Sequence, residues 1–255
     1  MPATVRLFMC IKDNFGVLLH DPATRRTAAI DVPEAAPVEA ALRDTGWTLT
    51  DILVTHHHGD HTAGIEELKA RYRCRVVAPD GEAGRIPAVD ETVKDGDPVS
   101  VGEITGHVIE TPGHTAAPAT LHFPSEKIVF AGDTLFSIGC GRVIEGSMDA
   151  MWQSMLKMKE LPDDTQLYCG HEYTMANIRF AQSIEPDNAA LAAREQQAKA
   201  QIAAGKPTLP STMAEEKAAN PFLRADVAAV AKAVGMAGAS AAEVFAELRV
   251  RKNKF

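Results

Sequence analysis

The chain has 255 residues, 45% of them hydrophobic and 24% charged, which is ordinary for a globular protein and leaves ample material for a core. Its net charge of −8 argues against general nucleic-acid binding, which usually needs a basic face, and no apolar run approaches the length that spans a bilayer. The first residues carry no cationic stretch before an apolar core, so we expect no signal peptide. Four scattered cysteines without a CxxC pair fit reduced thiols, and we expect a cytoplasmic protein.

The first part of the chain alternates between β-branched apolar runs and helical patterns, and Gly, Pro or Ser marks most strand ends. These patterns predict strands at 5–10, 15–19, 27–31, 51–55, 75–78, 107–110, 119–123, 127–131 and 166–169, and helices at 35–43, 65–71 and 148–161. Residues 79–98 are predicted to be loop and short strand. Residues 132–147 hold four glycines and are predicted to be one long loop.

After residue 172 the sequence pattern changes. No strand pattern is convincing there, and helices are predicted at 174–184, 187–204, 212–219, 224–234 and 240–249. Thr212 with Glu215, and Ser240 with Glu243, have the spacing of capping boxes, which mark helix N-termini. Strands with interspersed helices, followed by an all-helical stretch, predict an α/β body of about 170 residues with a helical appendage.

The densest group of reactive side chains directly follows the predicted strand that ends at residue 55. Within six positions the chain places His56, His57, His58, Asp60 and His61. Residues two apart on extended backbone face the same way, so His56 and His58 should share one site, while Asp60 and His61 follow where the chain turns toward a helix. His57 faces the other way and is expected to pack or to support a ligand. Imidazole with carboxylate suits zinc, iron or manganese, and chance is an unfavourable alternative with only nine histidines in the chain.

Three further residues of the ligand type each follow a predicted strand, with small residues beside them: His114, Asp133 and His171. Strand ends at one edge of a sheet converge in space, so these side chains can join the histidine-rich loop. Singly, each has an ordinary alternative, because a histidine after a strand is usually a surface residue. The combination is what predicts a metal site.

In this combination the chain resembles the metallo-β-lactamase fold superfamily and, within it, the glyoxalase II (hydroxyacylglutathione hydrolase) family. The supporting stretches are spread over nearly the whole chain, at 55–64, 111–115, 130–135, 139–142, 170–174, 220–224 and 249–255. The resemblance implies an α/β fold, a four-layer αββα metallo-β-lactamase sandwich with a C-terminal all-helical domain. Residues 1–172 would be the catalytic domain and residues 173–255 the helical substrate-binding domain.

The resemblance also implies two divalent metal ions per chain, with zinc expected first and iron or manganese as alternatives. Asp60 and Asp133 would be the catalytic carboxylates, and Asp60 would orient a hydroxide that forms because a metal pair lowers the pKa of water from 15.7 toward about 7. In the implied reaction, hydrolysis of a thioester, the leaving group is a thiolate. It needs little help to depart, since thiols have a pKa of about 8.5. The implied ligands are His56, His58 and His114 for the first ion, Asp60, His61 and His171 for the second, and Asp133 bridging both.

Substrate binding is implied for four residues that match glutathione-binding positions of the family: Arg142, Tyr173, Arg249 and Lys252. Guanidinium groups suit the two carboxylates of glutathione, and tyrosine supplies a hydrogen-bond donor. The sequence departs from the family at Arg142, where lysine is common, and at Ile144, where some members have tyrosine. Those departures leave open a weaker glutathione affinity or a related thiol carrier. The alternative for Arg249 and Lys252 is that they complete a helix C-terminus.

The implied activity is hydrolysis of the thioester of S-2-hydroxyacylglutathione, such as S-D-lactoylglutathione, to glutathione and D-lactate in methylglyoxal detoxification. The expected partner is this small thioester, and we expect no binding to nucleic acid or to a membrane. We also expect a monomer. Lactonase and β-lactamase activities would leave the basic C-terminus unexplained, and two main alternatives remain at this point. A glutathione persulfide dioxygenase on the same fold would use one iron and lack most of the helical domain. A non-catalytic metal-binding module is the other, and the intact ligand set argues against it.

Overall fold

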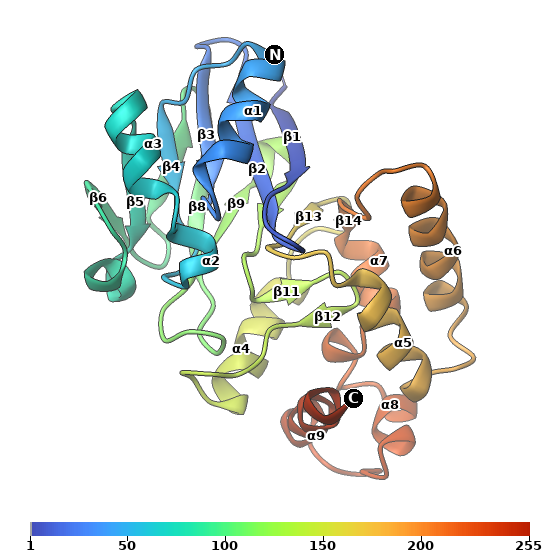
Figure 1. Ribbon diagram of the computed structural model, residues 1–255. Helices are drawn as coiled ribbons and strands as arrows, with labels where there is room; N and C mark the ends of the chain where they lie inside the picture. Colours follow the sequence, from blue (N-terminus) through green and yellow to red (C-terminus); the bar gives the residue numbers. More distant parts are fainter. Residues whose placement is uncertain (1) are drawn as a thin grey trace.

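The computed structural model describes residues 2–255, which form two six-stranded sheets with helices around them (Figure 1). In spatial order, the first sheet contains β1 (Thr4–Met9), β2 (Phe15–Asp21), β3 (Arg26–Ile30), β4 (Asp51–Leu53), β5 (Arg75–Pro79) and β6 (Glu91–Val93). The second contains β14 (Ser211–Thr212), β13 (Gln166–Tyr168), β10 (Ile128–Phe130), β9 (Ala119–Phe123), β8 (Ile104–Glu110) and β7 (Pro98–Val101). Both sheets mix parallel and antiparallel pairs.

The two sheets pack face to face around a shared apolar core. Side chains from β2, β5, β9 and β10 meet in it, among them Leu19, Val77, Leu121 and Phe130. Because successive residues of a strand point to opposite faces, their neighbours face outward and need a second cover. Helices on both outer faces supply that cover, so the structure has four layers.

On the first sheet the outer cover is α1 (Ala35–Thr45) with α3 (Ile65–Tyr72), which bury Leu18 and Ile52. On the second sheet it is α4 (Met148–Lys159), which packs with the C-terminal helices over Val129 and Leu167. The predicted αββα sandwich is therefore confirmed. The apolar runs of the strands explain this arrangement, because both faces of each sheet are buried.

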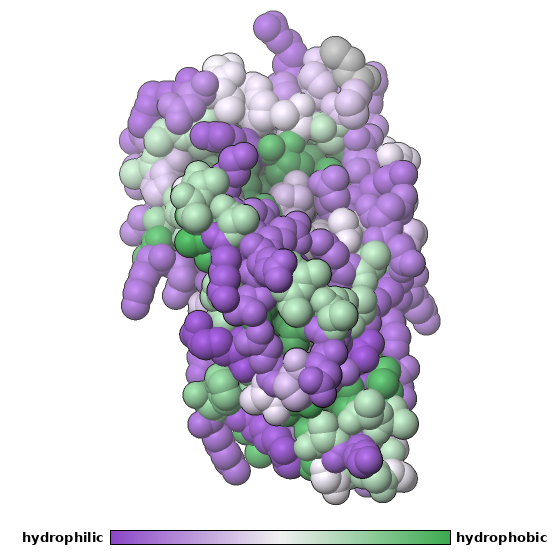
Figure 2. Space-filling view, turned by 90° about the vertical axis from the view of Figure 1, so that its right-hand side faces the viewer, coloured by the Kyte–Doolittle hydropathy of each residue, from purple (hydrophilic) through white to green (hydrophobic). Residues whose placement is uncertain are grey.

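The C-terminal helices gather on one side of the sandwich (Figure 1). They are α5 (Thr174–Ile184), α6 (Ala189–Ala203), α7 (Met213–Ala219), α8 (Ala228–Ala233) and α9 (Ala241–Lys254). Both predicted capping boxes are present, at the N-termini of α7 and α9. Figure 2 shows that hydrophilic side chains cover most of one lateral face, with hydrophobic ones in separate groups. Across residues 2–255, no helix combines the length and the apolar character that a bilayer crossing needs.

The structure differs from the predicted elements at short segments. The predicted long loop contains a hairpin of β11 (Leu135–Phe136) and β12 (Gly139–Cys140), and the histidine-rich loop contains one helical turn, α2 (Gly59–Thr62). The segment predicted to be all-helical also supplies β14, which pairs with β13. β7 was not predicted either. The two-residue strands β11, β12 and β14 are too short to show a periodicity, and only their pairing in the fold defines them.

Candidate metal centre

Four strands carry the predicted ligands to one place. The histidine-rich loop leaves β4, and the other ligand residues follow β8, β10 and β13. Within each of two groups, the possible ligand atoms lie within 4.8 Å of one another. The first group is His56, His58 and His114, and the second is Asp60, His61 and His171.

In the first group, three ring nitrogens face a common centre. Nδ1 of His58 lies 3.2 Å from Nε2 of His56 and 3.1 Å from Nε2 of His114. Burial, and after it the neighbouring His61, holds the pKa of His56 well below its ordinary value. Burial and the nearby His114 also lower the pKa of His58. These two rings are therefore neutral, which is the form that ligates metal.

The second group combines two rings with a carboxylate. Nε2 of His61 lies 3.3 Å from Nε2 of His171, and Oδ2 of Asp60 lies 3.5 Å from Nε2 of His171. Burial alone would raise the pKa of Asp60, but the hydrogen bond from Asn14 and the nearby His61 lower it below the ordinary value. Asp60 is thus a carboxylate, as a metal ligand requires.

Asp133 lies between the two groups. Its carboxylate oxygens are 3.4 Å from Nε2 of His114, 3.4 Å from Nε2 of His61 and 3.2 Å from Nε2 of His171. The group is buried, which raises its pKa, yet His61 and His171 hold the pKa well below the usual range. Within residues 2–255, Oδ1 of Asp133 has no hydrogen-bond partner. A buried carboxylate oxygen without a partner is costly, so this donor set fits divalent cations on both sides of Asp133.

Polar groups outside the centre hold four of the rings in place. In each, one ring nitrogen lies beside an oxygen atom and the other faces the centre, which is the usual arrangement of metal-binding histidines. The distances from Nδ1 are 3.0 Å to Thr55 Oγ1 for His56, 2.8 Å to Asp31 Oδ2 for His61, 2.9 Å to the Arg142 carbonyl for His114 and 3.1 Å to Asp13 Oδ1 for His171.

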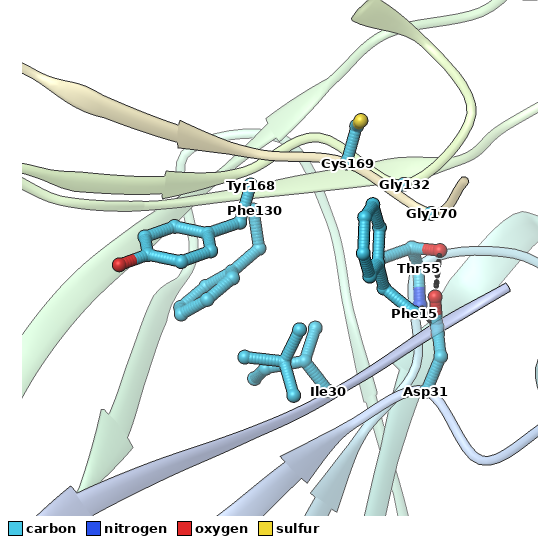
Figure 3. Close-up of a pocket in the computed structure, with 10 residues that line it drawn as sticks. Phe15, Ile30, Asp31, Thr55, Phe130, Gly132, Tyr168, Cys169 and Gly170 are labelled. Carbon is cyan, nitrogen blue, oxygen red and sulfur yellow. Dashed lines mark hydrogen bonds between the residues drawn. The ribbon is translucent and has the colours of Figure 1, made fainter. Parts of the chain in front are cut away.

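Asp31 is the most extensively bonded of these supporting residues, and sequence reasoning missed it. Its carboxylate accepts hydrogen bonds from the backbone N–H of Thr55 at 2.7 Å and from the Thr55 hydroxyl at 2.7 Å, besides facing His61. Figure 3 shows Asp31 and Thr55 joined at one side of a small cavity between the sheets, near Phe15 and Ile30. One carboxylate thus fixes both the start of the histidine-rich loop and a ring of the second group. Asp31 follows β3, which lies next to β4 in the sheet. A carboxylate at that strand end was the sequence signal that could have revealed its role.

The His57 side chain pairs with two carboxylates that belong to neither group, those of Glu82 and Glu145. Its Nδ1 lies 2.7 Å from Oε2 of Glu82, and its backbone N–H donates to the same oxygen at 2.8 Å. Glu82 is buried and also accepts the N–H of Ala117 at 3.1 Å. His57 therefore attaches the loop to its surroundings, in line with the supporting role expected from its orientation.

A cavity of about 350 Å³ connects the centre with the C-terminal helices. His114 and Asp133 of the centre line it, and so do all four residues predicted to bind substrate: Arg142, Tyr173, Arg249 and Lys252. The ring of Tyr173 stacks on His171 with centroids 4.7 Å apart. The cavity thus joins a group of metal-ligand atoms to three cationic side chains. Ile144, in contrast, is 52% exposed.

Arg249 and Lys252 both lie on the inner side of α9. Arg249 is buried, donates from Nη1 to the Cys140 carbonyl at 2.8 Å and sits 5.1 Å from the centre of the Phe222 ring. Because α9 continues to Lys254, Arg249 is not in its last turn, which argues against the helix-end alternative for this residue. Burial, with Arg249 nearby, lowers the pKa of Lys252 to about 8. The two cations lie close together, and this favours an anionic ligand.

Two family models and several relatives of known family agree on the relationship. Residues 10–171 match the metallo-beta-lactamase superfamily, and residues 172–255 match the hydroxyacylglutathione hydrolase C-terminus. Hydroxyacylglutathione hydrolases of Rhodopseudomonas palustris (strain BisA53) and Nitrobacter hamburgensis are each 61% identical to the chain over 254 residues, covering 100% of both chains. The chain belongs to the hydroxyacylglutathione hydrolase family. The family assignment accounts for both halves, since the second model covers the helical part.

Solved structures also resemble this member of the hydroxyacylglutathione hydrolase family. ETHE1 from Myxococcus xanthus is 26% identical with a TM-score of 0.71, over 98% of this chain and 91% of that one. The B3 metallo-beta-lactamase BLEG-1 is 20% identical with a TM-score of 0.65, over 86% of this chain and 99% of that one. The second likeness concerns the fold alone.

Proposed function

We propose that this chain hydrolyses the thioester of S-2-hydroxyacylglutathione, with S-D-lactoylglutathione as the substrate, to glutathione and D-lactate in methylglyoxal detoxification. The observation that carries the proposal is the cavity shared by His114 and Asp133 on one side and Arg249 and Lys252 on the other. A thioester whose carboxylates reach the cations would present its acyl carbon to the group of histidines. The names of the relatives support the same chemistry.

The proposal includes two divalent ions per chain, most simply zinc, held by the seven side chains of the centre. Such a pair, when bound, supplies a hydroxide at neutral pH and polarises the carbonyl. The fit rests on the partnerless buried oxygen of Asp133 and on the ring nitrogens that face inward on either side of it. Iron and manganese accept the same donor atoms. The ligands in this proposal are His56, His58, Asp60, His61, His114, Asp133 and His171.

Asp60 and Asp133 have distinct parts in the proposal. Nδ2 of Asn14 donates to Oδ2 of Asp60 at 3.1 Å and so fixes its rotamer, while the Asp60 side chain stays 46% exposed. Its lowered pKa keeps it ionised, so it can accept a hydrogen bond from the attacking water and orient it. Asp133 is buried, its oxygens lie 3.2–3.4 Å from ring nitrogens of both groups, and it would hold an ion on either side.

The chain's own residues also position the substrate. Arg142, Arg249 and Lys252 offer cationic groups to the two carboxylates of glutathione, and Tyr173 offers its hydroxyl. Because Lys252 has a pKa near 8, it is mostly charged at neutral pH. Residues 1–172 would thus supply the reaction centre and residues 173–255 most of the recognition, in a cytoplasmic monomer.

The two alternatives fit less well. A persulfide dioxygenase on this fold would lack most of the helical part, whereas here residues 172–255 match the hydroxyacylglutathione hydrolase C-terminus. A non-catalytic module would not need a cavity that joins the centre to a cationic pocket.

The direct test is hydrolysis of S-D-lactoylglutathione by protein of known metal content, with a simple acetyl thioester as comparison. We expect close to two metal ions per chain and a clear preference for the glutathione thioester. Absence of hydrolysis in metal-replete protein, or oxygen consumption with glutathione persulfide, would overturn the proposal.

A further inference from the structure

Two buried polar side chains of the helical part, Glu216 and Asn220, bind the hairpin β11–β12 and belong neither to the proposed metal centre nor to the cavity lining. Glu216, on α7, is fully buried, and its Oε2 accepts the backbone N–H of Ile138 at 2.7 Å. Nδ2 of Asn220 donates to the same oxygen at 3.1 Å and also to the carbonyls of Gly139 at 3.0 Å and Phe136 at 3.3 Å. One carboxylate and one amide thus hold the turn of the hairpin from the helical side.

The turn they hold has an unusual backbone. Ile138 has a φ of 58°, in the left-handed region that a β-branched residue rarely adopts. Its side chain is fully buried against Ile178 and Leu191 of the helical part. Conformations of this kind persist only where the surroundings enforce them, and they are concentrated at functional sites. The hydrogen bond from the Ile138 amide to Glu216 is one such constraint.

The hairpin links this anchor to the proposed substrate cavity. It starts two residues after Asp133, and Figure 1 shows it lying between the sandwich and the C-terminal helices. Phe136 and Cys140 line the cavity. The ring of Phe136 meets Tyr173 edge-on with centroids 5.3 Å apart, and the Cys140 carbonyl accepts the hydrogen bond from Arg249. A change in the turn would therefore move one wall of the cavity.

We propose that Glu216 is a positioning residue for the hydrolysis: by holding Ile138 in the left-handed conformation, it keeps Phe136 and Cys140 in the wall of the substrate cavity. The inference rests on the proposed function, because it assigns the cavity to the thioester. Glu216 acts only through the hairpin, so its loss should weaken substrate binding and leave metal content unchanged.

The test compares two variants at this position. Glu216→Met keeps the approximate length of the side chain but offers the Ile138 amide only a weak thioether acceptor, so we expect KM for S-D-lactoylglutathione to rise by about tenfold, with metal content unchanged. Glu216→Gln retains a carbonyl oxygen for the Ile138 amide and should keep KM within about twofold of the unaltered chain. Val38→Ala is the stability control, because Val38 is buried on α1, at the first sheet. It should lower the melting temperature without changing KM.

Hydrogen exchange separates this inference from the proposed function. The amides of the hairpin should exchange faster in Glu216→Met, while those of the histidine-rich loop stay protected, whether or not the chain hydrolyses the thioester. A folded Glu216→Met with unaltered KM, or a rise in KM that Val38→Ala shares, would overturn the inference. If Glu216→Met does not fold, hydrogen exchange of the Ile138 amide in the unaltered chain tests the inference. Slow exchange of the Ile138 amide, at the rate of the core strands, supports the anchor, and fast exchange refutes it.

Discussion

Replacing Asp31 by asparagine tests how strongly the supporting groups control the centre. The carboxylate faces two hydrogen-bond donors of Thr55 and Nδ1 of His61. Asparagine keeps one oxygen, for the Thr55 amide, and places an NH₂ group near the Thr55 hydroxyl and His61. An NH₂ group beside Nδ1 favours the other tautomer of His61, in which the proton sits on Nε2, the nitrogen that faces the metal centre.

The magnitude follows from what such partners contribute. Removing a group that orients a metal-binding histidine typically costs about 10–100-fold in metal affinity, or about 1.4–2.8 kcal/mol. We therefore expect Asp31→Asn to weaken metal binding by about this factor, measured by competition with a chromophoric chelator. Hydrolysis at limiting metal should fall in parallel, and excess metal should restore part of it.

A matched control is available on the same sheet. Asp51 is also fully buried, but it pairs with Arg26 at 3.0 Å and Arg75 at 2.8 Å, away from the centre. Asp51→Asn should lower stability and leave metal affinity unchanged. If Asp31→Asn binds metal as tightly as the unaltered chain, the argument that Asp31 sets the His61 tautomer is wrong.

Three further outcomes are expected. Asp133→Ala or His171→Ala should reduce hydrolysis to background and lower the metal content measured by mass spectrometry, and full activity with unchanged metal content would refute their assignment. Arg249→Ala combined with Lys252→Ala should raise KM for the glutathione thioester by about 10–100-fold, as expected for the loss of charge-assisted hydrogen bonds, whereas Lys254→Ala at the exposed end of α9 should not. KM should also rise as the pH increases through about 8, because burial and neighbouring arginines lower the pKa of Lys252 to about 8 and the neutral amine formed above that pH no longer attracts a carboxylate. A KM that is flat across this range would exclude Lys252 from carboxylate binding.

The sequence predicted much of the fold because its signals are local. Short apolar runs rich in β-branched residues marked most strands, and the capping boxes at Thr212 and Ser240 marked two helix starts correctly. The convergence of His114, Asp133 and His171 followed from a rule about strand ends, which needs no knowledge of the final packing.

The missed features depend on partners far away in the chain. Asp31 bonds to His61, thirty residues later, and Asp13 to His171, 158 residues later, so neither pairing has a spacing that can be read from the sequence. The β11–β12 hairpin was missed for the same reason. Within the described chain, its two-residue strands pair only with each other, and the turn between them is held by Glu216, far along the chain.

The most direct measurement is a crystal structure of the zinc-loaded chain with anomalous diffraction at the zinc edge. The account predicts two peaks per chain, one among His56, His58 and His114 and the other among Asp60, His61 and His171, with the Asp133 carboxylate between them. A single peak, or peaks away from Asp133, would contradict the central claim that these side chains gather two cations at the mouth of the thioester cavity.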